Sequence, residues 1–449
     1  MRYLPLSPDD RREMLAKVGV DHIDALFADV PAGKLLDKLP GLPLAASELE
    51  VERHMSQMAG RNLSAGQAKG FFVGAGAYRH HVPATVDHLI QRSEFLTAYT
   101  PYQPEISQGT LQVLFEFQTQ VGMLTGMEVA NASMYDGSTA TAEAVLMARR
   151  VTRRRKAILS GNLHPHYRDV VRNMERFSGG DLVLCDPAFE GAEDLKAQID
   201  DDTACVVVQT PDFYGNLHNY SELAEAAHAK KALLIVVVTE IVSLGALKSP
   251  GEIGADIVVC EGQSLGCGLD FGGPYVGLFA TRQKYIRQMP GRLCGQTVDA
   301  DGQSGFVLTL STREQHIRRE KATSNICTNS GLMALAFSIH LTLLGERGLR
   351  GLADLNHAAA AQLAQKLTAV AGVELVTERF FNEFTLRLPQ PAAEVVERLA
   401  EQKILAGVPI SRLLPGEDGA QNLLLVAATE MVTAEQSDLF AKALEEVLS

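Results

Sequence analysis

The strongest constraint on the fold is an alternation of short apolar runs with helix-like segments between residues 109 and 256. The apolar runs that we interpret as strands occupy residues 129–134, 156–160, 182–185, 205–209, 233–238 and 257–260. The helical segments between them occupy residues 140–150, 166–176, 192–198 and 220–230. Since the runs are continuously apolar, both faces of each strand should be covered. The pattern therefore predicts an α/β domain with a mostly parallel sheet.

The two ends of the chain carry different patterns. Residues 7–59 are rich in amphipathic helix, and Ser7-Pro8-Asp9-Asp10 is a good helix start. Such an arm cannot enclose a core by itself, so we expect it to wrap the main body or a partner subunit. After the glycines at 345–351, the C-terminal part reads as a smaller α/β domain, and its expected elements are helices 352–370, 392–403 and 434–448 and strands 373–376, 384–388 and 423–427. The predicted divisions are an N-terminal helical arm at 1–95, a large domain at 96–345 and a small domain at 346–449.

Composition narrows the function classes. With 41 basic and 54 acidic residues the net charge is −13, which disfavours nonspecific binding to nucleic acid or an anionic membrane. The N-terminus lacks the apolar run of a signal peptide, and no stretch of about 18 uninterrupted apolar residues is present, so we expect a cytoplasmic protein. The six cysteines show no C-x-x-C spacing, which predicts reduced thiols and neither a disulfide nor a metal site. The adjacent pair His80-His81 lacks further ligand spacing and does not change that expectation.

One loop stands out between the helical patterns, residues 99–109, which read Y-T-P-Y-Q-P-E-I-S-Q-G. Two prolines fix their own φ and push the preceding residues toward extended conformations, so the segment is stiff. A stiff loop that presents polar side chains tends to carry function. Its candidate residues are Tyr99, Tyr102, Gln103, Glu105 and Ser107.

Polar segments follow three of the predicted strands, where parallel sheets bind ligands. Asp136, Gly137, Ser138 and Thr139 open an Ala-rich helix, which suits either a phosphate or a plain helix cap. Residues 209–216 could line a pocket or merely turn, and residues 261–266 enter a glycine-rich stretch that implies close backbone approach.

A basic segment at 313–321 remains, and it reads as a solvated helix face or an ion-pair network. Arg313, His316, Arg318 and Arg319 could instead receive anionic groups.

Four sequence motifs resemble those of a known family. They are Y-T-P-Y-Q-P-E-I-S-Q-G at 99–109, V-A-N-A-S-M-Y-D-G at 129–137, M-P-G-R at 289–292 and R-E-Q-H-I-R-R-E-K-A-T-S-N-I-C-T at 313–328. The chain resembles the glycine dehydrogenase (decarboxylating) P-protein family along nearly its whole length, and its length and arm match subunit 1, the α chain of the two-subunit bacterial form. The resemblance implies a fold-type-I pyridoxal-phosphate-transferase-like large domain.

The same resemblance implies an activity and partners. In this family glycine loses its carboxyl carbon as CO2 with the help of pyridoxal phosphate, and the aminomethyl group passes to the lipoyl arm of the H-protein. In the catalytic half of the family, the cofactor-binding lysine follows a histidine shortly after a strand. The matching stretch here carries Gln263 and Ser264, and a serine cannot bind the cofactor covalently. Thr239 and Glu240 stand where related α chains usually show an aspartate.

These departures imply a chain that needs a second subunit, subunit 2, in a heterodimer or heterotetramer. Pyridoxal phosphate would be bound mainly by that partner, residues 136–139 would be a vestigial anion site, and the loop 99–109 would reach the partner's active site. Two alternatives stay open. One is a self-sufficient pyridoxal-phosphate decarboxylase that uses another lysine, such as Lys248, Lys284 or Lys321; the other is a structural or regulatory scaffold.

Overall fold

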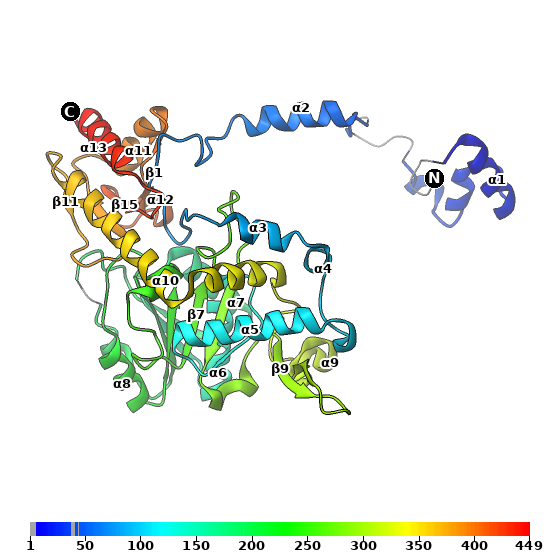
Figure 1. Cartoon of the computed structure of the whole chain (residues 1–449), viewed down its shortest axis with the longest axis horizontal. Helices are drawn as coiled ribbons and strands as arrows, with labels where there is room; N and C mark the ends of the chain where they lie inside the picture. The colour runs from blue at the N-terminus through cyan, green and yellow to red at the C-terminus, as the bar shows by residue number, and fades with distance from the viewer. Residues whose placement is uncertain (1–5, 37–40, 44, 192) are drawn as a thin grey trace. The chain divides into compact units, whose positions relative to one another are not determined.

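A computed structural model describes residues 6–36, 41–43, 45–191 and 193–449 (Figure 1). The chain divides into two compact units, Met1–Leu63 and Ser64–Ser449, and each is described by itself. The first unit contains α1 (Pro8–Val18) and α2 (Glu48–Ala59), with two short 3-10 turns between them. We call the second unit, Ser64–Ser449, the body.

Helix α1 begins where its sequence predicts. The Ser7 side chain accepts a hydrogen bond from the Asp10 backbone N–H, and Asp10 in turn bonds the Ser7 backbone, which completes a capping box at the start of α1. Gly19 ends that helix in the left-handed conformation, with φ of 86°. Neither α1 nor α2 contains a buried residue. Their stability therefore rests on caps and local pairs.

The compact body begins at Ser64, whereas the sequence places the end of the N-terminal arm at residue 95; the predicted division at 1–95 stays a prediction. Strand β1 (Gly70–Phe71) pairs in parallel with β13 (Ile404–Leu405), and Phe72 is buried in the C-terminal core. The sequence carries no local signal for this pairing, because β1 has only two residues and finds its partner more than 300 positions away.

The body is built on a seven-stranded sheet in the order β2-β8-β7-β6-β5-β3-β4. Its strands are β2 (Val129–Ala130), β3 (Lys156–Leu159), β4 (Asp181–Leu184), β5 (Thr203–Gln209), β6 (Leu233–Val238), β7 (Ile257–Glu261) and β8 (Gly277–Thr281). Only β8 runs antiparallel to its neighbours. The predicted mostly parallel sheet is confirmed, whereas the expected strand at 129–134 is reduced to β2 and an isolated bridge at Met134.

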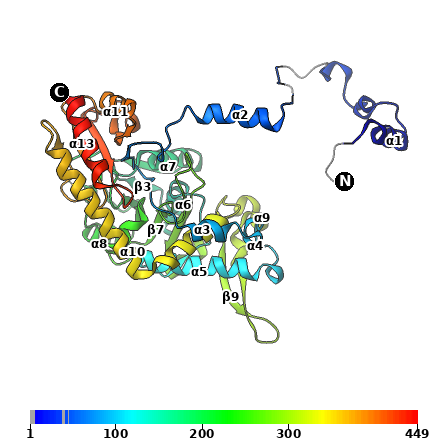
Figure 2. The ribbon, with the colours of Figure 1, turned by 45° about the horizontal axis from the view of Figure 1, so that its top comes forward.

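Helices cover both faces of this sheet (Figures 1 and 2). They are α5 (Gln108–Thr125), α6 (Gly137–Thr152), α7 (Pro165–Ser178), α8 (Ser221–Ala229) and α10 (Gly331–Thr368). Val206 and Val236 point to one core, which includes residues of α5, α8 and α10, and Val207 and Val237 point to the other, which includes residues of α6 and α7. This alternation explains why the strands read as continuous apolar runs. The helix expected at 192–198 is only a 3-10 turn, Lys196–Gln198, within the described residues.

Helix α10 crosses the predicted boundary at 345–351. It continues from Gly331 to Thr368 with one kink at Gly345, whose φ of 57° and ψ of −174° are not helical. Among the described residues it is the helix long and apolar enough to cross a membrane by length and composition, but 44% of its most apolar window is buried inside the protein. It packs against α5 as a core helix. The separate small domain at 346–449 therefore stays an interpretation.

The C-terminal layer has its own sheet and core. The sheet follows the order β11-β12-β15-β14, with β11 (Glu374–Leu375), β12 (Glu383–Arg387), β14 (Val408–Pro409) and β15 (Leu423–Ala427). Helices α11 (Ala392–Glu401), α12 (Ile410–Leu413) and α13 (Ala434–Leu448) complete it. Elements that the sequence did not predict are α3 (Ala84–Ile90), α4 (Ser93–Leu96) and the hairpin of β9 (Leu293–Val298) and β10 (Ser304–Thr309). The basic segment 313–321 forms the short helix α9 (Gln315–Arg318).

Candidate functional site

Segment 74–80 of the chain lies against residues that follow β3, β6 and β7, at the carboxyl ends of these strands, where an α/β sheet binds ligands. The Tyr78 backbone N–H donates to Gln263 Oε1 at 2.8 Å, and Gln263 Nε2 donates back to the Tyr78 carbonyl at 2.9 Å. His164 Nε2 lies 2.9 Å from the Ala75 carbonyl oxygen. A Cβ on Gly76 would meet the His164 ring at 3.0 Å. We call residues 74–80 the plug, since they occupy this space with backbone.

The residues that the sequence placed at the strand ends lie beside this plug. Ser264 follows β7 and is 1% exposed, and its Oγ has no hydrogen-bond partner in the described part of the chain. Thr239 follows β6, and its Oγ1 is 3.3 Å from Gln209 Nε2. Both side chains are buried. Since the residues are a serine and a threonine, the strand ends have no lysine at position 264 and no aspartate at position 239. The three alternative lysines at 248, 284 and 321 are all exposed.

The start of α6 is occupied by carboxylates. Asp136 Oδ1 accepts the Thr139 backbone N–H at 2.8 Å, and Ser138 Oγ donates to Asp136 Oδ2 at 2.8 Å. The Gly137 N–H donates to Glu261 Oε2 at 3.0 Å. Burial raises the pKa of Glu261 to about 8. The capping interpretation accounts for these contacts, whereas a phosphate would have to displace two carboxyl groups; the vestigial anion site stays a prediction.

An ion triad anchors the far end of the plug. His80 Nε2 lies 3.0 Å from Glu240 Oε2, and His80 Nδ1 lies 2.9 Å from Glu430 Oε2. Burial alone would lower the pKa of His80, but the two carboxylates raise it to about 10. Glu430 also accepts the His81 backbone N–H at 2.7 Å. His80 is thus a buried cation between two carboxylates, and no metal-ligating cluster occurs among the described residues.

A second buried carboxyl group holds the near end of the plug. Glu383 Oε1 accepts the Ala75 N–H at 2.6 Å, and the Tyr78 hydroxyl donates to Glu383 Oε2 at 2.7 Å. Burial raises the pKa of Glu383 to about 7. Because Glu383 belongs to β12, the C-terminal layer takes part in closing the strand ends of the central sheet.

The loop 99–109 lies elsewhere on the body and is exposed. Tyr99 is 74% exposed and Tyr102 is 59% exposed. Gln103 and Glu105 are also exposed, Ser107 is half-buried, and residues Pro104–Ile106 form a 3-10 turn that leads into α5. The predicted loop residues therefore gather on one accessible surface, away from the filled strand ends.

A buried arginine, Arg292, packs against the Tyr102 ring of this loop. Arg292 is 3% exposed, and its guanidinium carbon lies 5.3 Å from the centre of the Tyr102 ring. Its Nε lies 3.6 Å from Glu314 Oε2, but neither Nε nor Nη1 has a hydrogen-bond partner in the described residues. Thr100 and Thr328 hydroxyl oxygens are 3.1 Å apart and tie the loop to the segment before α10. Sequence reasoning missed Arg292, because its contact with Tyr102 spans 190 positions.

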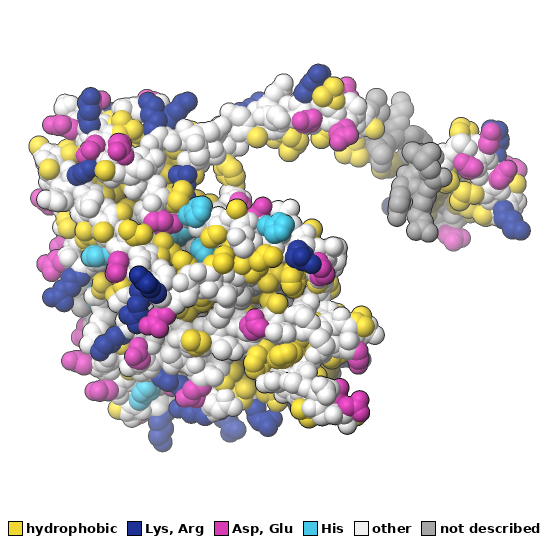
Figure 3. All heavy atoms as spheres, viewed as in Figure 1, with side chains coloured by type: hydrophobic (Ala, Val, Ile, Leu, Met, Phe, Trp, Pro, Cys, Tyr) yellow, Lys and Arg dark blue, Asp and Glu magenta, His cyan; other side chains and the backbone are white. Residues whose placement is uncertain are grey.

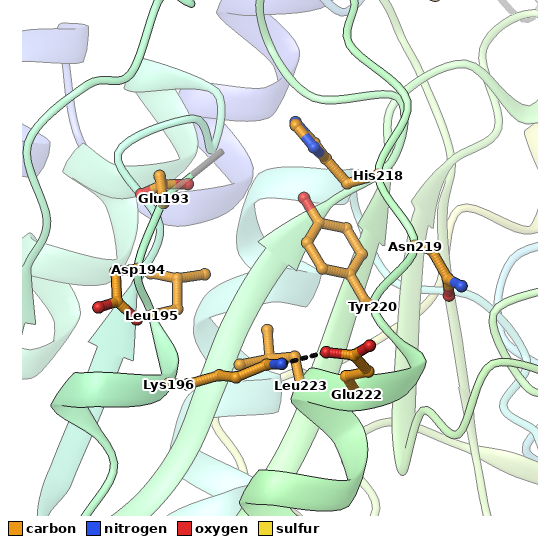
Figure 4. Close-up of a pocket in the computed structure, with 9 residues that line it drawn as sticks. All are labelled: Glu193, Asp194, Leu195, Lys196, His218, Asn219, Tyr220, Glu222 and Leu223. Atoms are coloured by element: carbon orange, nitrogen blue, oxygen red, sulfur yellow. Dashed lines mark hydrogen bonds and ion pairs between the residues drawn. The ribbon is translucent and has the colours of Figure 1, made fainter. Parts of the chain in front are cut away.

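A cavity of about 440 Å³ lies at the surface near α8 (Figure 4). Glu193, Asp194 and Glu222 face it, and Glu222 pairs with Lys196. His218, also in this wall, lies 3.0 Å from Asp212 Oδ2, and hydrogen bonding to Asp212 raises the pKa of His218. In this cavity Lys196 pairs with Glu222, and His218 pairs with Asp212. The lining of the cavity includes no residue of the plug or of the loop 99–109.

The architecture defines the class first. A sphingosine-1-phosphate lyase from Burkholderia pseudomallei matches with a TM-score of 0.65 at 13% identity and covers 92% of each chain. A NifS-like protein matches with a TM-score of 0.60 at 13% identity and covers 84% of this chain and 99% of that one. At such identities the likeness shows the fold alone, which is that of the fold-type-I pyridoxal-phosphate enzymes, as the sequence predicted.

Closer relatives define the family. The family model of the glycine cleavage system P-protein matches residues 1–442. A probable glycine dehydrogenase (decarboxylating) subunit 1 from Xanthobacter autotrophicus is 66% identical and one from Parvibaculum lavamentivorans is 65% identical, each over 100% of both chains. A crystal structure of glycine decarboxylase (P-protein) in inhibitor-bound form superposes with a TM-score of 0.91 at 44% identity over 100% of both chains.

The chain therefore belongs to the glycine cleavage system P-protein family, in the branch of its subunit 1, a component of the decarboxylating glycine dehydrogenase. The predicted family and enzyme class are confirmed.

Proposed function

We propose that this chain is the subunit of a heteromeric glycine decarboxylase that does not itself hold pyridoxal phosphate. The observation that carries the proposal is the plug: residues 74–80 occupy the carboxyl ends of β3, β6 and β7, and their backbone is hydrogen-bonded to Gln263 and His164. A cofactor ring could enter only if this segment left. Subunit 2 would then supply the lysine and the cofactor.

The residues around the plug do not fit the cofactor. Ser264 cannot bond it covalently, Thr239 offers no negative charge for a pyridine nitrogen, and two carboxyl groups take the N–H groups at the start of α6. A phosphate next to Asp136 and Glu261 would meet like charge whenever Glu261 is ionised. Each of these features opposes binding by itself, and together they support assigning the cofactor to the partner.

The role left to this chain is to complete the partner's active site with the loop 99–109. In the assembled enzyme, glycine would be decarboxylated on the partner's cofactor and the aminomethyl group would pass to the lipoyl arm of the H-protein. We assign to Tyr99, Tyr102, Gln103, Glu105 and Ser107 the shaping of that pocket, because the loop is exposed, stiffened by two prolines and braced by Arg292. A cytoplasmic location fits such an enzyme.

Trapping with borohydride and mass spectrometry tests the assignment of the cofactor. The purified chain is mixed with pyridoxal phosphate, reduced with borohydride and examined by mass spectrometry, alone and with subunit 2. We expect a covalent adduct only in the complex, on subunit 2. An adduct on a lysine of this chain at full stoichiometry that persists in excess pyrophosphate would overturn the proposal and favour the self-sufficient enzyme.

Point changes in the loop test its role. Tyr102→Phe and Glu105→Gln should leave assembly intact and lower turnover by about tenfold or more, the usual cost of losing one hydrogen bond to a charged group. Glu401→Gln is the matched control, because Glu401 is equally exposed at the end of α11 and forms no ion pair within the described residues. Normal turnover in both loop variants would favour the scaffold alternative instead.

A further inference from the structure

A cavity of about 420 Å³ lies on the body where the end of α6 meets the 3-10 turn Gln283–Gln288 and the segment 310–323. Five cationic side chains line it, namely Arg150, Arg287, Arg313, Arg318 and Lys321. No carboxylate is among its lining residues. Figure 3 shows Lys and Arg side chains gathered along the lower edge of the body, the edge at which α6 lies in Figure 1. Such a concentration is unexpected in a chain with a net charge of −13.

The cations of this cavity lack the partners that nearby cations have. Arg149 pairs with Glu175, and Lys156 pairs with Asp200 at 2.7 Å. By contrast, Arg287, Arg318 and Lys321 form no ion pair within 4.0 Å among the residues that the structure describes. Of the two interpretations of the basic segment 313–321, the internal ion-pair network therefore does not hold for Arg318 and Lys321.

The floor of the cavity is fixed. Arg313 is 7% exposed and donates to the carbonyl groups of Met289, Gly291 (2.8 Å) and Leu310 (3.1 Å). Arg150 is half-buried and donates to the Gln288 carbonyl at 3.2 Å, while its buried Nε has no partner among the described residues. Both side chains thus hold positive charge at set positions without a carboxylate in contact.

The electrostatics of this floor are unbalanced. Burial lowers the pKa of Arg150 and of Arg313, which is the mark of cations desolvated without full compensation. The nearest acids that act on them are Glu143 and Glu314. Burial raises the pKa of Glu143, so its negative charge is itself disfavoured. An anion that entered the cavity would relieve this imbalance.

We propose that this cavity binds a phosphate-type oxyanion, either pyrophosphate or the phosphate group of a small ester. Guanidinium groups match phosphate oxygens in a bidentate geometry, and the hydroxyls of Thr312 and Thr323, which also line the cavity, can donate to the remaining oxygens. The exposed Arg287, Arg318 and Lys321 make the contacts, and Arg150 and Arg313 supply fixed charge below. The space is larger than a single phosphate requires.

Binding of pyrophosphate to the purified full chain tests the site by isothermal titration calorimetry at constant ionic strength. Arg318→Gln and Lys321→Gln should each weaken binding by about tenfold, since each removes one charge-assisted contact. Arg347→Gln is the control, an exposed arginine on α10 that does not line the cavity, and it should bind like the unchanged chain. Equal affinity in all four proteins, or no binding, would overturn the proposal.

Two further arms separate competing sources of signal. Hexaglutamate replaces pyrophosphate in the first; tighter binding of this peptide than of pyrophosphate would overturn the phosphate assignment in favour of an acidic protein segment. Pyridoxal phosphate with borohydride is used in the second. An adduct that maps to Lys321 and is lost with excess pyrophosphate would support this cavity, and it would be distinguished by position from a cofactor at the strand ends. The site thus stands or falls independently of the proposed function.

Discussion

The buried triad of His80, Glu240 and Glu430 makes a prediction about stability and pH. The pKa of His80 is raised from 6.5 to about 10 in the folded protein. A group whose folded pKa is raised stabilises the fold fully below its unfolded pKa and loses this contribution as pH rises through the folded pKa. At about 1.4 kcal/mol per unit, the contribution amounts to about 4–5 kcal/mol below pH 6.5.

The variant His80→Gln removes this titration, and its free energy of unfolding is compared with that of the unchanged chain. We expect the difference between the two proteins to shrink by about 1 kcal/mol per pH unit between pH 6.5 and 9.5. Titrating groups that do not contact His80, including Glu383, are common to both proteins and cancel in the difference. A constant residual cost should remain at high pH, because the substitution also removes the buried imidazole ring and its hydrogen bonds to Glu240 and Glu430.

Urea unfolding followed by circular dichroism at four pH values measures this slope. His88→Gln is the matched control, since His88 is exposed on α3 and has no ion pair among the described residues. It should follow the unchanged chain at every pH. A difference between His80→Gln and the unchanged chain that does not vary with pH would refute the assignment of His80 as the buried cation that anchors the plug.

Three further predictions follow from the same geometry. Ser264→Lys should not create a borohydride-reducible adduct at position 264, because the plug fills the space, and overpacking should lower stability by about 1–3 kcal/mol; a stoichiometric adduct detected by mass spectrometry would show that the plug moves aside. Arg292→Gln should loosen the loop, because it removes the contact with the Tyr102 ring. Limited proteolysis should then cleave faster at 99–109, and turnover should fall while subunit binding is retained. Unchanged cleavage would mean that the prolines alone hold the loop. Gly215→Ala should lower the free energy of unfolding several-fold more than Gly416→Ala. Both glycines have positive φ (91° and 85°), but only at Gly215 would a Cβ overlap the Glu383 backbone. Equal urea midpoints of the two variants would contradict this.

Much of the large domain could be predicted because its signals are local. The apolar run that became β6 is bounded as predicted at residues 233 and 238. Outside that domain, Ser7 and Gly19 mark the ends of α1 as their types suggest. The long sequence words at 99–109 and 313–328 were enough to suggest the family, which the relatives then confirmed. Local prediction failed where an element is very short, as at β1, or where a helix runs through glycines, as α10 does through Gly345.

The sequence by itself determined the sheet, the family and the absence of a lysine at position 264, because these depend on residue type and spacing along the chain. Only the tertiary structure decided what fills the strand ends and which cations stay unpaired. His80 meets Glu430 across 350 positions and Arg292 meets Tyr102 across 190. No local pattern encodes such contacts, since they arise when separate elements pack on one sheet and bring their side chains together.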